Sequence, residues 1–208
     1  MMGTVIIDYG VGNIGSLTSA LDEINMQYAL SSDIDVIKNA QAVILPGVGA
    51  FEAAMSQLRK RDLVGILREK AKDGTPFIGI CLGMQLLFET SEENGFHQGL
   101  GLIKGCVKQI PATVKIPHMG WNRLDFKLTD EILKNNSDGD YVYYVHSYYA
   151  VAKEENIVAG SCYGVKIPGI VRHGNIIGMQ FHPEKSSDAG LNLLRAFKDL
   201  TKKNQGGG

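Results

Sequence analysis

Apolar runs alternate with helix-like segments along the first part of the chain. Three short, largely apolar runs end at or beside a glycine or cysteine: 4–10 (TVIIDYG), 41–47 (QAVILPG) and 75–81 (TPFIGIC). Between and after them, apolar side chains recur every three or four residues, which predicts helices within 14–24, 51–70 and 82–89. Apolar strands that alternate with helices are typical of a parallel sheet covered on both faces.

Further along, the pattern changes to β-rich segments separated by Gly, Pro or Asn. These segments are 104–112, 114–126, 141–152, 156–164, 167–174 and 175–184. Gly174 and Asn175 predict a hairpin turn, and residues 189–203 have the spacing of a closing amphipathic helix. The expected fold class is therefore α/β: a single three-layer domain with a central, mostly parallel sheet, extended by antiparallel strands in the second half. We expect this domain to span 1–200, with 201–208 as a disordered tail or an artificial remnant.

Composition narrows the class of protein. The chain has 208 residues, 44% of them hydrophobic, and a formal net charge of −1 with no basic block, so a nucleic-acid partner is not expected. No apolar run approaches the roughly 20 residues that span a bilayer, and the N-terminus lacks the features of a cleaved signal, so no membrane partner is expected either. Three widely spaced cysteines indicate a reducing compartment rather than a disulfide framework, and we expect a cytoplasmic protein.

Cys81 stands between two glycines where a predicted strand meets a predicted helix. The stretch GICLG has the pattern of a nucleophile elbow, a tight turn that presents a reactive side chain. N–H groups at a helix start favour the thiolate, and the N–H of Leu82 is a natural oxyanion donor. Gln85 lies one helical turn further on, on the same face. Taken alone, the pattern fits a cysteine that only packs at this junction equally well.

A histidine and a glutamate follow much later, in the stretch MQFHPEKS. His182 and Glu184 are two residues apart, so in an extended chain their side chains point the same way. A general base and the carboxylate that orients it require this arrangement. A lone His-x-Glu is more often a surface pair at a strand end, but an elbow cysteine in the same chain favours the catalytic interpretation.

The stretch PGVG, residues 46–49, follows another predicted strand. Its backbone lies at the carboxyl edge of the parallel sheet, where open α/β sheets bind ligands and where Cys81 is expected. Two glycines allow a peptide of this loop to turn and to supply a second oxyanion donor. An ordinary strand–helix turn would show the same residues.

Together, PGVG, GICLGMQ and FHPE, in this order, resemble the class I (triad) glutamine amidotransferases. The resemblance extends over about residues 4–200 and implies hydrolysis of glutamine to glutamate and ammonia. It implies that Cys81 is the nucleophile, that His182 is base and acid, and that Glu184 orients His182. It further implies that the oxyanion and the glutamine are held by Gly47, Val48, Gly49, Leu82, Gln85, Ser147 and Tyr148. Because adjacent Ser147 and Tyr148 cannot both point inward from a regular strand, we expect a bend or a main-chain contact there.

The stretches IDYGVGNIGS, PHMGWN and YYVHSYYA are most similar to family members that serve histidine biosynthesis. That similarity implies a heterodimer with a separate (β/α)8-barrel cyclase, which takes up the ammonia and closes an imidazole ring, and it implies no cofactor and no metal. The residues it places toward this partner are Asn13, Met119, Trp121, Asn122 and Tyr143. An amidotransferase that feeds a different synthase, such as a sugar-amidating enzyme, is the alternative.

Two further alternatives are a non-enzymatic subunit on the same fold and a peptidase built on a similar elbow. All three triad residues are present, which disfavours the first, and Gln85 has no evident purpose in the second. His118, His146 and His173 show no metal-ligand spacing, so we interpret them as structural or surface residues.

Overall fold

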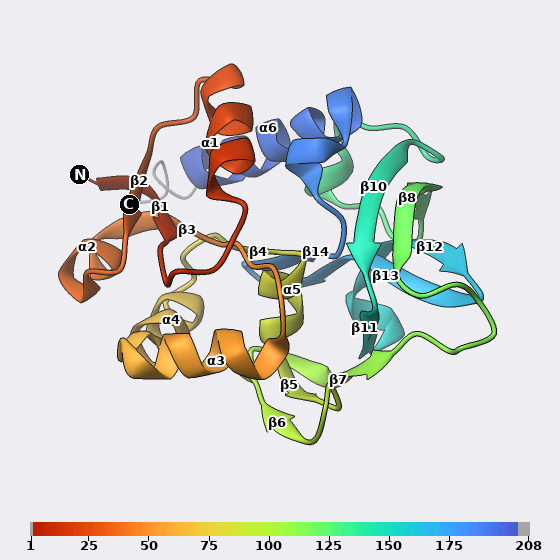
Figure 1. Ribbon diagram of the computed structural model, residues 1–208. Coiled ribbons are helices and arrows are strands. Elements are labelled where there is room, and N and C mark those ends of the chain that lie inside the picture. Colours follow the sequence, from red (N-terminus) through yellow and green to blue (C-terminus); the bar gives the residue numbers. More distant parts are fainter. Residues whose placement is uncertain (1, 204–208) are drawn as a thin grey trace.

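A computed structural model describes residues 2–203 and shows one central sheet of eight strands (Figure 1). In spatial order the strands are β2 (Tyr28–Ser31), β1 (Met2–Ile7), β3 (Ala40–Leu45), β4 (Phe77–Ile80), β14 (Ile176–Met179), β13 (Val165–His173), β12 (Ile157–Tyr163) and β9 (Asp125–Phe126). The strands from β2 to β14 are parallel, and β13, β12 and β9 continue the sheet in antiparallel pairs. The predicted fold class is confirmed, and the predicted hairpin turn joins β13 to β14.

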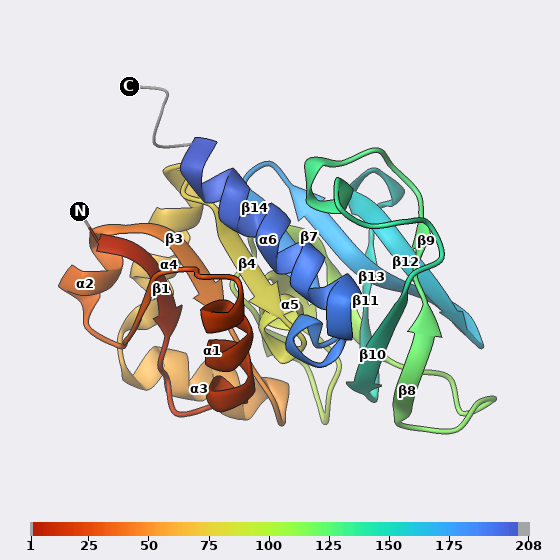
Figure 2. The ribbon, with the colours of Figure 1, turned by 90° about the horizontal axis from the view of Figure 1, so that it is seen from above.

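Helices cover both faces of this sheet. Helices α1 (Ile14–Glu23) and α6 (Ser187–Lys203) lie on one face, as Figures 1 and 2 show. The other face is covered by α2 (Ile34–Lys38), α3 (Phe51–Lys60), α4 (Leu63–Lys72) and α5 (Leu82–Leu86). Side chains alternate along β1, so Ile6 packs in the core beneath α1 and α6 while Val5 and Ile7 pack in the opposite core. This alternation produces the three layers.

The other β-rich segments form two small sheets of their own, which the sequence pattern did not separate from the central sheet. One has the spatial order β11 (Tyr148–Ala152), β7 (Ile103–Gln109), β5 (Phe88–Ser91) and β6 (His97–Gln98). The other is a two-stranded ribbon of β8 (His118–Arg123) and β10 (Tyr141–His146). Short 3-10 turns lie at Glu131–Leu133, Glu154–Asn156 and Pro183–Lys185.

Several predicted boundaries are wrong. The helix predicted over 82–89 ends at Leu86, because the carbonyls of Leu86 and Leu87 accept hydrogen bonds from the segment 100–103, and β5 follows. The stretch 51–70 is two helices, divided at Asp62, whose φ is 56°. β2 and α2 were not predicted.

The expected tail also begins too early. Helix α6 runs to Lys203, three residues past the expected boundary, and the side chain of Thr201 is buried. The helix continues because the side chain of Thr201 still packs against the domain, although charged residues lie on either side of it. Residues 204–208 lie outside the described part of the chain.

Helix α5 lies in unusually close contact with β3 and β4. A methyl group at Gly83 would lie 1.9 Å from the carbonyl oxygen of Leu45, and one at Gly79 would lie 2.6 Å from the carbonyl oxygen of Gly83. Both neighbours are backbone atoms, which do not move aside as a flexible side chain does. The absence of these two side chains therefore sets where α5 starts.

We predict that Gly83→Ala lowers the free energy of unfolding by about 3 kcal/mol, because the added methyl group overpacks a rigid junction. Gly65→Ala in α4 is the control: nothing lies within 4 Å of the added methyl group, and alanine favours a helix by up to about 1 kcal/mol. Urea denaturation of both variants measures the difference. Equal stability of the two would contradict the close-packing argument.

Candidate active site

Cys81 occupies a strained turn between β4 and α5. Its φ of 54° and ψ of −112° are unusual for a residue with a side chain, and it is 6% exposed. Its N–H donates to the carbonyl of Met179 at 2.7 Å, and its carbonyl accepts from the N–H of Gln85, so the turn is held from both sides. Strain of this kind persists only where the surroundings impose it, and it concentrates at functional sites.

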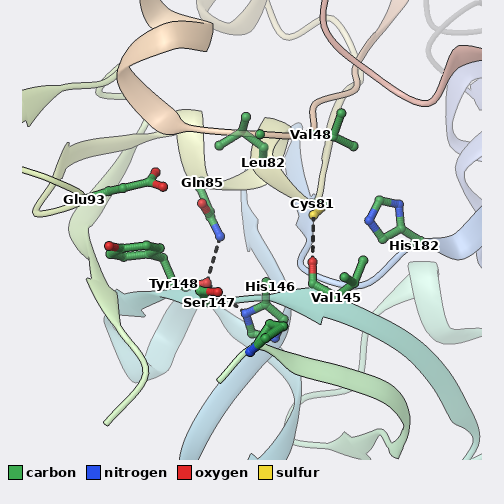
Figure 3. Close-up of a pocket in the computed structure, with 12 residues that line it drawn as sticks. Val48, Cys81, Leu82, Gln85, Glu93, Val145, His146, Ser147, Tyr148 and His182 are labelled. Carbon is green, nitrogen blue, oxygen red and sulfur yellow. Dashed lines mark hydrogen bonds between the residues drawn. The ribbon is translucent and has the colours of Figure 1, made fainter. Parts of the chain in front are cut away.

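The structure brings His182 and Glu184 together beside this turn. The Nδ1 of His182 lies 2.7 Å from Oε1 of Glu184, and both side chains are 3% exposed. Glu184 reaches the imidazole from a 3-10 turn, so the expected extended geometry is wrong although the expected contact forms. Within residues 2–203, Nε2 of His182 has no hydrogen-bond partner, and Figure 3 shows the imidazole lying next to Cys81.

The charge state of His182 is governed by these two neighbours. Burial of the imidazole lowers its pKa, but the neighbouring Cys81 and the hydrogen-bonded carboxylate of Glu184 more than offset this and raise the pKa to about 10. An imidazolium at neutral pH stabilises a neighbouring thiolate.

Cys81 and His182 lie at one end of a pocket of about 390 Å³. Figure 3 shows Cys81 and Val48 on one side of it and the segment 145–148 on the other, with Gln85 between Cys81 and Glu93. The remaining lining residues are Gly49, Leu82 and Pro117. The thiol of Cys81 donates a weak hydrogen bond of 3.9 Å to the carbonyl of Val145.

The loop 46–49 lies beside Cys81, and Val48 and Gly49 line the same pocket as the cysteine. In this loop the carbonyl of Gly47, and not an N–H group, points to the start of α5. The N–H of Leu82 donates to the carbonyl of Gly47 at 3.3 Å, so the expected oxyanion donor is occupied within the protein. The hydroxyl of Tyr9 donates to the carbonyl of Pro46 at 2.7 Å and holds the start of the loop. Gly49 has a φ of +97°, a conformation that glycine adopts readily.

Gln85, Ser147 and Tyr148 also meet at the pocket. The amide nitrogen of Gln85 donates to the carbonyl of Tyr148 at 2.8 Å and to Oε1 of Gln180 at 3.1 Å, which leaves its amide oxygen to accept from a ligand. Ser147 lies in a bend between β10 and β11, which satisfies the expectation that the two neighbours cannot both point inward from a regular strand.

Glu93 was not among the predicted site residues, and it reaches the pocket from the loop after β5 (Figure 3). Its Oε2 accepts from the N–H of Phe51 at 2.7 Å, at the start of α3. This hydrogen bond places Glu93 in the pocket, and it forms because α3 packs against β6 of the four-stranded small sheet. His146 was not a predicted site residue either, and its place in the pocket wall follows from the pairing of β10 with β8.

The residues predicted to face a partner fall into three groups. Met119 and Trp121 project from β8 and are 61% and 52% exposed, and Tyr143 lies opposite Trp121 with ring centroids 6.0 Å apart. Asn122 does not share this face: its amide donates inward to the carbonyl of Cys162 and to His118. Asn13 lies elsewhere, in a small hollow beside His182 and Glu184.

Within residues 2–203, no group of three or more His, Cys, Asp or Glu side chains is placed to hold a metal ion. All three cysteines are free thiols. Over the same described range, no helix combines the length and the apolar character needed to cross a membrane.

Comparisons with known proteins agree with the site. The family model described as glutamine amidotransferase class-I matches residues 5–199. The chain is 51% identical over 199 residues to the imidazole glycerol phosphate synthase subunit HisH of Listeria monocytogenes serotype 4a (strain HCC23), with 95% of each chain covered. It is 50% identical over 196 residues to the subunit of the same name from Oceanobacillus iheyensis, with 94% of this chain and 98% of that one covered.

Solved structures share the fold. A crystal structure described as a glutamine amidotransferase has a TM-score of 0.76 at 18% identity, covering 95% of this chain and 98% of that one. The structure of PurLQS from Thermotoga maritima has a TM-score of 0.73 at 20% identity, covering 96% and 98%.

The chain therefore belongs to the class I glutamine amidotransferase family, and it is an enzyme of that class, as the sequence analysis predicted. Within the family it groups with the HisH subunits of imidazole glycerol phosphate synthase, because half of its residues are identical to theirs over nearly the whole length.

We predict that Glu184→Gln lowers the pKa of His182, because it removes one of the two groups that raise it. A raised pKa in the folded state stabilises the fold fully below the ordinary value of 6.5, and the stabilisation is lost as pH rises toward about 10. The substitution should therefore cost about 2 kcal/mol at pH 6 and less at pH 9, as measured by urea denaturation. Glu155→Gln, at an exposed ion pair with Lys153, should cost little at either pH. A cost for Glu184→Gln that does not change between the two pH values would contradict the raised pKa.

Proposed function

We propose that this protein is the glutaminase subunit of an imidazole glycerol phosphate synthase. It hydrolyses glutamine to glutamate and ammonia and passes the ammonia to a (β/α)8-barrel cyclase subunit, which forms imidazole glycerol phosphate and AICAR in histidine biosynthesis. The observation that carries the chemistry is the strained Cys81 beside the buried His182–Glu184 pair at the end of an amino-acid-sized pocket. The identity to the HisH subunits supports the destination of the ammonia.

In the proposed mechanism the thiolate of Cys81 attacks the side-chain carbonyl carbon of glutamine and forms a tetrahedral oxyanion. His182 then protonates the departing ammonia, which leaves a thioester on Cys81. A water molecule, deprotonated by His182, attacks the thioester and releases glutamate and the thiolate. Glu184 holds the imidazole orientation throughout through its 2.7 Å contact with Nδ1.

The oxyanion would be stabilised by the N–H of Leu82 and by an N–H of the loop at Val48. In the structure the carbonyl of Gly47 occupies the Leu82 donor, so the Gly47–Val48 peptide has to turn before both donors are available. Each donor contributes about 3 kcal/mol of transition-state stabilisation in comparable sites. The side chain of Val48 is 40% exposed, so it does not anchor this peptide in the core.

Charge complementarity orients the substrate in the pocket. The carboxylate of Glu93 suits the α-ammonium group of glutamine. The amide oxygen of Gln85 is placed to accept a hydrogen bond from the same ammonium group. The backbone at Ser147 and Tyr148 forms the opposite wall. The pocket thus suits a substrate with an ammonium group near Glu93 and a side-chain amide that extends to Cys81.

The exposed apolar side chains of Met119, Trp121 and Tyr141 form the proposed docking face for the cyclase. This face belongs to the ribbon β8–β10. Near the C-terminal end of β10, the carbonyl of Val145 accepts a hydrogen bond from the thiol of Cys81. A biosynthetic enzyme with three free cysteines suits the cytoplasm, where we place it.

Cys81→Ala should lower glutaminase activity at least about a thousand-fold, because no other thiol lines the pocket. With the cyclase present, synthesis from added ammonium should be unchanged, since that route bypasses the cysteine. Cys162→Ala, at an exposed cysteine, is the control and should keep full glutaminase activity. Glutamate release is the readout. Retained activity in Cys81→Ala would exclude the proposed nucleophile.

Trp121→Ala should weaken binding of the barrel cyclase by about 2 kcal/mol, as expected for a central aromatic anchor. Phe96→Ala removes a similarly exposed aromatic side chain in the loop between β5 and β6 and should leave binding unchanged. Titration calorimetry with the cyclase measures both. If the cyclase fails to stimulate glutaminase turnover of the wild-type protein and a sugar-amidating synthase stimulates it instead, the alternative partner holds.

A further inference from the structure

Two buried histidines face each other on the inner side of the ribbon β8–β10. His118 and His146 are register partners in the antiparallel pair and are 3% and 6% exposed. Nδ1 of His118 lies 2.9 Å from Nε2 of His146. The proposed reaction uses neither residue, yet His146 lines the pocket and lies beside Ser147 and Tyr148 in Figure 3.

The direction of the hydrogen bonds through this pair is fixed at both ends. Nδ1 of His146 lies 2.8 Å from the carbonyl of Tyr148, which only accepts, so Nδ1 donates and Nε2 of neutral His146 accepts from His118. Nε2 of His118 then accepts from the amide nitrogen of Asn122 at 3.2 Å. The amide of Asn122 is itself oriented, because it donates to the carbonyl of Cys162 and its oxygen accepts from the N–H of Arg123.

Aromatic rings hold this chain of hydrogen bonds, which runs from Asn122 through His118 and His146 to Tyr148 and is called the relay below, in place. His118 is stacked between Tyr144 and Tyr163, with ring centroids 4.5 Å and 4.0 Å away. The hydroxyl of Tyr144 is 2.8 Å from Oγ of Ser161, and the hydroxyl of Tyr163 donates to the carbonyl of Lys115. His118 therefore has little freedom to rotate or shift, and His146 is positioned against a rigid neighbour.

Both imidazoles are neutral at physiological pH. Burial lowers the pKa of His118 to about 4. Burial also lowers the pKa of His146 to about 3, against the raising effect of the hydrogen bond to the Tyr148 carbonyl, and the positive charge of His182 opposes a further proton. A neutral His146 keeps Nε2 as an acceptor, which the relay requires.

We propose that His118 and His146 are positioning residues for glutamine binding: they hold the Tyr148 carbonyl, and through it the side chain of Gln85, in the wall of the pocket. The carbonyl of Tyr148 accepts from His146 and from Gln85 at 2.8 Å each. A loss of the first bond leaves the carbonyl free to shift, and Gln85 shifts with it. This inference rests on the proposed function, because it concerns the substrate of the same site.

Two substitutions of His146 separate the positioning role from simple packing. The amide nitrogen of asparagine occupies nearly the place of Nδ1 of histidine, whereas that of glutamine occupies the place of Nε2. His146→Gln should therefore lose the donor to Tyr148 and raise the KM for glutamine about ten-fold, with kcat changed much less. His146→Asn keeps that donor and should recover most of the wild-type KM. Both are assayed with the cyclase present, together with their melting temperatures.

Equal KM values for the two variants, or a fall in kcat alone, would overturn the positioning role. Nitrogen-15 NMR of the wild-type imidazoles tests the relay without any substitution. At pH 7 both histidines should be neutral with the proton on Nδ1, and a proton on Nε2 of either would overturn the proposal even if a variant fails to fold. An absence of glutaminase activity in the wild type would instead contradict the proposed function and leave the NMR result standing.

Discussion

The close contact of α5 with the ends of β3 and β4 is the constraint on which the site depends. Gly83 lies where a methyl group would overlap the Leu45 carbonyl, and Gly47 packs where a methyl group would lie 2.8 Å from the Tyr9 hydroxyl. With α5 held this close, Cys81 has to turn sharply and takes a positive φ. The strained conformation of Cys81 is therefore maintained by close packing around Gly47 and Gly83, which take no part in the chemistry.

The ribbon β8–β10 connects the parts of the site that come from distant parts of the chain. The carbonyl of Tyr143 accepts from the N–H of His182, and the carbonyl of Val145 accepts from the thiol of Cys81. On the ribbon's inner face, His146 reaches Tyr148 and the glutamine wall. One short element thus contacts the nucleophile, the base and the substrate pocket while its outer face remains exposed. The proposed docking face is therefore the outer side of the same ribbon whose backbone contacts Cys81 and His182.

Much of the site was predictable because local patterns report local backbone geometry. A cysteine between glycines at a strand–helix junction, a histidine two residues before a glutamate, and a glycine loop after a strand each depend on a few neighbouring residues. The topology of parallel strands then places their carboxyl ends at one edge. Glu93 was not predicted, and Asn122 was predicted to face a partner although its amide points inward, for the opposite reason. Their positions depend on which sheet β5 joins and on which face of β8 packs inward, and no local pattern reports either.

The sequence by itself determined the α/β class, the elbow at Cys81 and its association with His182 and Glu184, because apolar periodicity and glycine placement constrain the backbone directly. The tertiary structure alone decided the division of the later strands into three sheets, the occupied Leu82 donor and the pairing of His118 with His146. These features depend on hydrogen bonds between residues far apart in the chain, such as the 2.9 Å contact between the two imidazoles. Long-range pairings of this kind are chosen by the free energy of the whole packed domain and not by any one segment.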